Sequence, residues 1–128
     1  TPAGIFGLDN RAIKIPALTS GHVTEMTCDS HGKTLDVFST LAHMHKLGRH
    51  VRVTRNSDVI YEGDWDFDQQ LTVPKTITIT PTDAINLTCR FDNPTGVEIG
   101  YGESSDDEMC AFVLYYTPFE ALDGCIKS

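Results

Sequence analysis

Apolar and polar residues alternate with a period of two along much of the chain. In residues 76–80 (TITIT), Ile77 and Ile79 fall on one face and threonines on the other. Residues 84–91 (AINLTCRF) and 50–55 (HVRVTR) alternate in the same way. Successive side chains on a strand point to opposite faces, so this pattern predicts half-buried antiparallel strands.

Turn-forming residues separate these segments, at positions 55–58, 80–83, 92–96 and 103–107. No segment keeps a helical stripe over three turns. The one brief candidate, residues 36–47 (DVFSTLAHMHKL), is rich in β-compatible residues and leads straight into the next strand pattern. Many short strands at intervals of about ten residues predict an all-β fold, an antiparallel β-sandwich of the jelly-roll kind.

Length and charge narrow the class of protein. The 128 residues suit one domain, 1–128, with 40% hydrophobic and 22% charged residues. The net charge of -8 argues against nucleic acid and anionic membrane surfaces as partners, because both need a basic face. No apolar run is long enough to span a bilayer. The chain does not begin with methionine, and we expect it to be a piece of a longer protein.

Four cysteines, none in a CxxC pair, weaken a structural-zinc interpretation: Cys28, Cys89, Cys110 and Cys125. An even count in a small domain predicts two disulfides and an oxidising compartment, and the spacing leaves three pairings open. The alternative is four free buried thiols. Asn86 begins a glycosylation sequon, NLT, a triplet that is frequent by chance.

His43 and His45 are two residues apart in a predicted strand. They would share a face with Leu41, while Ala42 and Met44 face the other side. Two imidazoles one strand step apart could bind a single metal ion with little backbone strain. The alternative is a pair of surface histidines near a turn.

Met109 follows an acidic turn and opens a strongly apolar segment. A methionine in that position usually fills the core. A thioether ligand is soft and neutral, and it favours Cu(I) over zinc, magnesium or iron. A set of two histidines and one methionine would therefore suit a copper ion, although spacing alone does not join Met109 to the histidines.

Several segments, in order, resemble the copper type II, ascorbate-dependent monooxygenases, the family of dopamine β-hydroxylase and the peptidylglycine α-hydroxylating enzyme. Residues 41–51 (LAHMHKLGRHV) are similar to its H-x-H-x-x-G segment, and residues 100–118 to its strand with a Glu-Met-Cys motif. Residues 63–70 (GDWDFDQQ) and 87–96 (LTCRFDNPTG) occur between them in the expected order. Residues 3–16 resemble the entry to the second of the family's two copper domains.

The resemblance implies a ligand set and a reaction. His43, His45 and Met109 would be the three protein ligands of one copper ion that cycles between Cu(I) and Cu(II). An open position would bind O2, which is activated to hydroxylate a C–H bond of a small-molecule substrate. Ascorbate would be the external reductant.

The resemblance also implies disulfides Cys28–Cys125 and Cys89–Cys110. The second would brace the strand that carries Met109, as a weak thioether ligand requires. A disulfide-bonded member of this family is expected to be secreted, extracellular or in a periplasm or vesicle lumen.

This sequence departs from the family in its second copper site. The family's other copper is held by three histidines of a preceding domain, which these residues do not include. His22, His31 and His50 are isolated, and we expect them at the surface or supporting the site. The domain alone is therefore expected to bind copper and O2 but to turn over weakly or not at all, with a second copper domain as a possible partner.

A second departure concerns the substrate. Leu41 stands where the peptide-amidating branch has an arginine, and Ala111 and Val113 stand where it has an asparagine and a tyrosine. A clamp for a peptide carboxylate is therefore not expected.

Three smaller features accompany the motifs. Trp65, the single tryptophan, is expected to pack the sandwich or a loop lid, with substrate stacking as the alternative. Residues 106–108 are expected to form a solvated turn in which one carboxylate accepts backbone N–H groups, with a hard-cation site as the alternative. Gly100 and Gly102 are expected to permit a tight backbone path beside the site.

Three functions remain open from the sequence. The first is the oxygen-activating domain of a copper monooxygenase. The second is a non-catalytic extracellular copper-binding module. The third is a disulfide-bonded sandwich for adhesion that binds no metal.

Overall fold

The computed structural model describes residues 2–119 and 122–128. In that part of the chain the regular structure is β-strand, and no helix is long and apolar enough to cross a membrane. The strands are β1 (Gly4–Asn10), β2 (Lys14–Ile15), β3 (Thr19–Cys28), β4 (Leu35–Met44), β5 (Gly48–Arg55), β6 (Asp58–Asp64), β7 (Val73–Ile79), β8 (Ile85–Asn93), β9 (Ile99–Gly100), β10 (Cys110–Thr117) and β11 (Cys125–Lys127).

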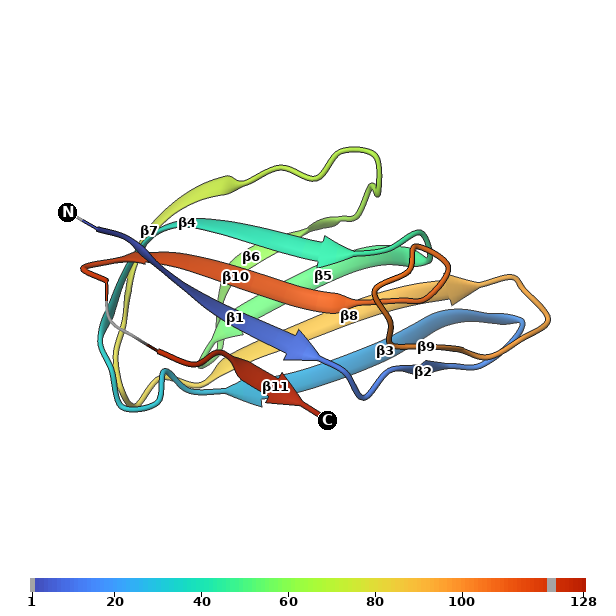
Figure 1. The fold of residues 1–128 in the computed structure, drawn as a ribbon, viewed down its shortest axis with the longest axis horizontal. Coiled ribbons are helices and arrows are strands. Elements are labelled where there is room, and N and C mark those ends of the chain that lie inside the picture. Colours follow the sequence, from blue (N-terminus) through green and yellow to red (C-terminus); the bar gives the residue numbers. More distant parts are fainter. Residues whose placement is uncertain (1, 120–121) are drawn as a thin grey trace.

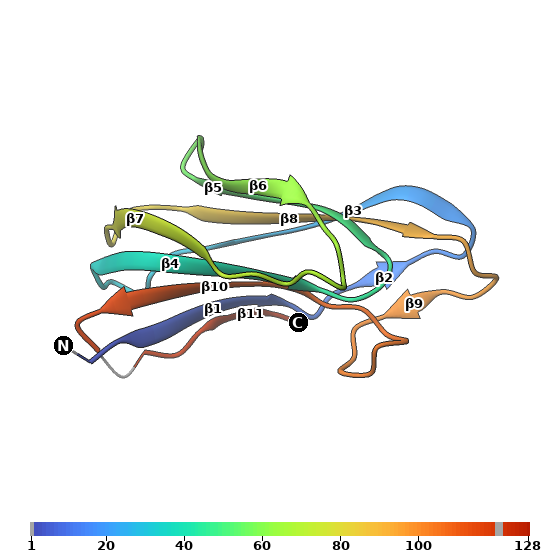
Figure 2. The ribbon, with the colours of Figure 1, turned by 90° about the horizontal axis from the view of Figure 1, so that it is seen from above.

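Two sheets form the body of the fold (Figure 1). One sheet has the order β11-β1-β10-β4-β7, and the other has the order β3-β8-β5-β6. Figure 2 shows them as two layers, with the short pair β2 and β9 beside one end. All pairings are antiparallel except that of β1 with β11. The predicted all-β, antiparallel sandwich is confirmed.

The core lies between the two sheets and is built by strand alternation. The predicted inward face of β8 is fully buried: Ile85, Leu87, Cys89 and Phe91 are each 0% exposed. The facing residues of β10 are buried as well: Phe112, Leu114 and Tyr116. Burying one large apolar side chain contributes about 1.5–3 kcal/mol, so the alternating pattern supplies the main driving force for this fold.

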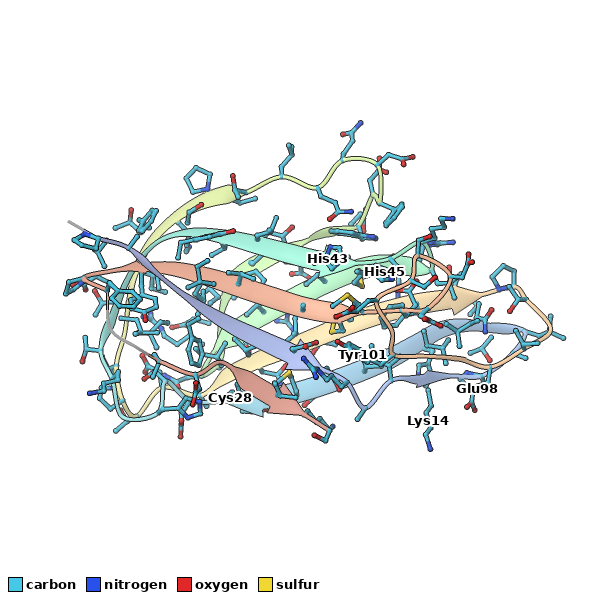
Figure 3. All side chains as sticks on the ribbon, viewed as in Figure 1. Lys14, Cys28, His43, His45, Glu98 and Tyr101 are labelled. Carbon is cyan, nitrogen blue, oxygen red and sulfur yellow. A yellow bond between two sulfur atoms is a disulfide. The ribbon has the colours of Figure 1, made fainter. Side chains whose placement is uncertain are left out.

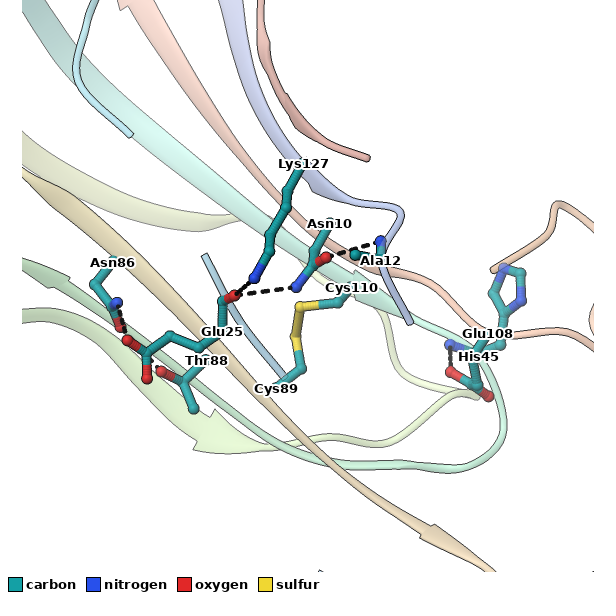
Figure 4. Close-up of a disulfide and its surroundings, with 10 residues drawn as sticks. All are labelled: Asn10, Ala12, Glu25, His45, Asn86, Thr88, Cys89, Glu108, Cys110 and Lys127. Carbon is teal, nitrogen blue, oxygen red and sulfur yellow. Dashed lines mark hydrogen bonds between the residues drawn. A yellow bond between two sulfur atoms is a disulfide. The ribbon is translucent and has the colours of Figure 1, made fainter. Parts of the chain in front are cut away.

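Both predicted disulfides are present, and they use all four cysteines. Cys28–Cys125 joins β3 to β11, with 6.3 Å between the Cα atoms. Cys89–Cys110 joins β8 to β10, with 6.1 Å between the Cα atoms (Figure 4). Each bridge links one sheet to the other, and Cys110 fixes the start of the strand that follows Met109.

A loop between β9 and β10 folds back on itself at one end of the sandwich. The Glu108 N–H donates to the Gly100 carbonyl at 2.9 Å, and the Gly102 N–H donates to the Glu108 carbonyl at 3.1 Å. A side chain at position 102 would run into the Asp107 carboxylate. The predicted tight path at Gly102 is confirmed, and it places residues 107–109 against the end of β4.

Candidate metal centre

The two histidines lie side by side at the end of β4 (Figure 3). Their ring centroids are 5.1 Å apart, with the rings nearly perpendicular. Ala42 and Met44 point into the core, with 2% and 0% exposure, so the predicted division of faces is confirmed. His45 lies one residue beyond the strand and is 5% exposed, whereas His43 is half-buried.

Each imidazole has its Nδ1 atom engaged by an acceptor. His45 Nδ1 lies 3.0 Å from the Asp107 carbonyl oxygen, and His43 Nδ1 lies 2.8 Å from Gln70 Oε1. The Gln70 amide nitrogen donates to the Phe67 carbonyl, so its oxygen faces His43. A carbonyl oxygen only accepts, so each ring in its neutral form carries its proton on Nδ1. The Nε2 lone pairs are left for a metal, which is how metal-binding histidines are usually oriented.

Met109 is the residue that precedes β10. β10 pairs Cys110 with Met44 and Ala111 with His43, so extending this register by one residue beyond both strands sets Met109 opposite His45. Met109 is partly exposed, whereas its neighbours Glu108 and Cys110 are 0% exposed. Its side chain therefore lies on the outer face with Ala111 and not among the aliphatic residues of the core.

Glu108 holds the turn that follows the histidines. One carboxylate oxygen accepts the backbone N–H group of His45 at 3.0 Å (Figure 4). The other accepts the backbone N–H group of Leu47 at 2.8 Å. Burial raises the pKa of Glu108, while the hydrogen bonds from Leu47 and His45 oppose that rise. The predicted carboxylate that accepts backbone N–H groups is present. The expectation of a solvated turn is wrong at Glu108, because this side chain is buried and both of its oxygens accept hydrogen bonds from the protein backbone.

The segment after β6 forms a wall against the histidines. The Trp65 indole N–H donates to the His45 carbonyl at 3.0 Å, and its ring meets His43 edge-on at 6.1 Å between centroids. The Phe67 ring lies 6.2 Å from the His45 ring. Trp65 is partly buried and packs against the core, which is the first of its two predicted packing roles, and its ring also borders the histidines. Phe67 and Gln70 had no expected role from the sequence, although both lie in the segment GDWDFDQQ, residues 63–70.

The described residues contain no group of three or more His, Cys, Asp or Glu side chains arranged to hold a metal ion. The histidine pair therefore needs a different kind of third donor. Imidazole nitrogens and a thioether form a donor set that suits Cu(I), and the register that sets Met109 opposite His45 is compatible with such a group.

The remaining histidines make other contacts. His50 lies between Glu62, at 2.9 Å from Nε2, and Asp64, at 3.0 Å from Nδ1. Hydrogen bonds to Glu62 and then Asp64 raise the pKa of His50. The exposed His31 ring packs edge-on against Phe6.

The outer face beside His43 is apolar. The register of β4 with β10 places Leu41 opposite Val113, two residues along from the pair of His43 and Ala111. All four side chains are partly exposed. These are the positions at which the sequence departs from the peptide-amidating branch, and the structure brings them together next to the histidines.

A surface hollow of about 520 Å³ adjoins the wall segment. Its charged lining residues are Lys46, Arg49, Asp66 and Asp68, beside the Trp65 and Phe67 rings. The lining thus combines both signs of charge with aromatic surface.

A disulfide-bonded β-sandwich with a buried and a half-buried histidine side by side, and a methionine just before the paired strand, defines the class of domain. Over residues 1–128 the sequence matches the model of the copper type II ascorbate-dependent monooxygenase, C-terminal domain. The chain belongs to this family.

Two curated relatives agree with that assignment. The chain is 27% identical over 104 residues to a tyramine beta-hydroxylase of Caenorhabditis briggsae, covering 71% of the chain and 17% of the relative. It is 30% identical over 100 residues to the human DBH-like monooxygenase protein 1, covering 71% of the chain and 16% of the relative. The chain thus spans about a sixth of these relatives.

One solved structure, titled "Crystal structure of dimeric latent PorU from Porphyromonas gingivalis", shares 8% sequence identity with the chain at a TM-score of 0.36. The match covers 90% of this chain and 12% of that one.

Proposed function

We propose that this domain binds one copper ion through Nε2 of His43, Nε2 of His45 and the Met109 sulfur. We further propose that it is the oxygen-activating part of a monooxygenase that hydroxylates a C–H bond of a small substrate, with ascorbate as reductant. The observation that carries the proposal is the hydrogen bonding of both rings through Nδ1, which leaves two bare Nε2 atoms on neighbouring side chains.

The chain's residues have distinct tasks in this proposal. Gln70 and the Asp107 carbonyl fix which nitrogen of each ring donates to the metal. Met109 is a soft donor and favours the monovalent state. Bound copper supplies the one-electron redox chemistry that O2 reduction requires.

The apolar surface of Leu41, Ala111 and Val113 supports a substrate that presents an uncharged carbon beside His43. None of these three side chains can pair with a carboxylate, so they do not favour a free peptide terminus as the recognised group.

A non-catalytic copper-binding module is the second candidate. Within the described residues there is no second cluster of ligands, and hydroxylation needs two electrons where one copper ion supplies one. The domain alone is therefore proposed to bind copper and O2 with weak or no turnover, and a second copper domain is the proposed partner. The two disulfides favour a secreted protein or one in an oxidising lumen.

An anaerobic Cu(I) competition titration tests the proposal. Wild type is expected to bind one equivalent, and His43→Ala or His45→Ala is expected to abolish binding with little change in the melting temperature of the metal-free protein. His31→Asn is the matched control and should bind as wild type. No binding by wild type would leave only the metal-free adhesion role, and unchanged binding in both alanine variants would show that His43 and His45 are not the ligands.

A product assay separates the enzyme from the module. Copper, O2 and a chemical reductant or partner domain are added to candidate substrates. If wild type forms a hydroxylated product and His43→Ala does not, the result supports the enzyme. If wild type forms no product with any reductant or partner domain, the result supports the copper-binding module.

A further inference from the structure

The Trp65 side chain contacts both the His43 ring and the His45 backbone. Its indole N–H donates to the His45 carbonyl at 3.0 Å. Its ring stands edge-on to the His43 ring, at 6.1 Å and 89°. Trp65 is the first residue after β6, so a segment distant in sequence from β4 contacts both proposed ligands.

The hydrogen bond acts on the peptide of His45 and not on its ring. The same carbonyl accepts the Gly48 N–H at 3.3 Å, while the His45 N–H donates to Glu108. Both sides of this residue's backbone are thus held just beyond the end of β4, where the sheet no longer fixes it. That restraint sets the direction in which the His45 side chain leaves the chain.

Trp65 is itself anchored to the same hairpin. Its backbone N–H donates to the Arg49 carbonyl at 2.9 Å, and the Arg49 side chain donates to the carbonyls of Lys46 and Gly48. The indole is therefore attached to the β4–β5 turn through its backbone and its side chain. A ring held at two points restricts the rotation of its neighbour more than a freely rotating side chain would.

We propose that Trp65 is a positioning residue of the metal centre. Its N–H fixes the His45 peptide and its ring limits the orientation of His43, so that the two imidazoles are pre-arranged before any metal binds. This inference rests on the proposed function for its consequence in copper affinity, but the arrangement of the rings is a property of the metal-free protein.

Two variants separate the two contacts. Trp65→Phe keeps an aromatic ring and removes the N–H donor, and Trp65→Leu removes both. Tyr61→Phe, an aromatic substitution on the neighbouring β6, is the matched control. The first readout is the nuclear Overhauser effect between the His43 and His45 rings in the metal-free protein. It should be weaker in Trp65→Phe, weaker still in Trp65→Leu, and unchanged in Tyr61→Phe.

The second readout is copper binding. Cu(I) affinity should fall roughly tenfold in Trp65→Phe and roughly a hundredfold in Trp65→Leu, the range usual for residues that orient ligands. The Cu(II) electron paramagnetic resonance spectrum should broaden in both variants. If the Trp65 variants melt at a lower temperature but keep the wild-type copper affinity, ring contacts and spectrum, then Trp65 only contributes to packing and the inference is overturned. Absence of Cu(I) binding by wild type overturns the proposed function instead, and the ring contacts then still decide the positioning role.

Discussion

Histidines lie among polar partners in two regions of this domain, and the two arrangements differ in the number and the charge of the hydrogen-bond acceptors. At the end of β4, His43 and His45 each have one nitrogen bound to a neutral oxygen acceptor and the other left bare. On the outer face of the β5–β6 pair, His50 has both nitrogens bound to carboxylates, those of Glu62 and Asp64.

The number and charge of the acceptors decide what each histidine can do. A ring with two carboxylate partners donates from both nitrogens in its cationic form, which these partners favour and which has no lone pair for a metal. A ring whose Nδ1 donates to one carbonyl oxygen has, in its neutral form, a lone pair on Nε2 that can bind a metal. The same residue type thus favours a surface ion pair in one sheet and a potential metal donor in the other.

The largest expected effect comes from Glu108, which supports the first region. Glu108→Ala leaves the buried N–H groups of His45 and Leu47 without an acceptor, at about 1–3 kcal/mol each. We expect a loss of about 3 kcal/mol in the free energy of unfolding, measured by urea denaturation. Asp106→Ala, in the exposed part of the same loop, should change it by less than about 0.5 kcal/mol. Equal losses in the two variants would contradict the bracing role of Glu108.

Met109 should have the next largest effect, on metal preference and not on stability. Met109→Ile is similar in volume and replaces the soft donor with an inert side chain. We expect Cu(I) affinity to fall roughly tenfold or more, about 1.4 kcal/mol per factor of ten, with a much smaller change for Cu(II). Competition titrations of both oxidation states measure the difference. Parallel losses for the two states would remove Met109 from the ligand set.

The smallest effect is predicted for His50, whose neighbours Glu62, Asp64 and Arg52 share its face, with Arg90 opposite it on β8. Its pKa is raised in the folded state from a reference of 6.5. The stabilisation is therefore fully present below pH 6.5 and is lost as the pH rises through the folded pKa.

His50→Gln should accordingly lower the free energy of unfolding by about 0.5–1 kcal/mol at pH 6 and by almost nothing at pH 9, because exposed pairs are weak. Chemical denaturation at both pH values measures this. A deficit that grows with pH would show that His50 is not held as a cation. Copper affinity should be unaffected, which sharpens the contrast with the first region.

Much of the fold follows from local pattern. Alternation predicted the buried face of Ile85, Leu87 and Cys89, and it also placed Met44 away from the histidines, because a strand's facing depends only on neighbouring positions. The disulfide pairing did not follow from alternation, and only the family resemblance indicated it.

The supports of the site were harder to predict. Gln70 lies 27 residues from His43, and Glu108 lies 63 residues from His45. No periodic signal in the sequence connects positions so far apart. In the sequence, the buried Glu108 also looks the same as its solvent-exposed acidic neighbour Asp106. The candidate metal ligands therefore came from residue type, the spacing of the two histidines and the family resemblance, whereas the residues that orient the two histidine rings required the folded chain.

The central claim is tested most directly by the nitrogen chemical shifts of the imidazoles in the metal-free protein and after addition of Ag(I), a diamagnetic substitute for Cu(I). The account predicts that His43 and His45 are both protonated on Nδ1, and that Nε2 of both shifts with one equivalent of Ag(I) while His50 does not respond. Protonation of either ring on Nε2, or a response confined to one of the two, would contradict it.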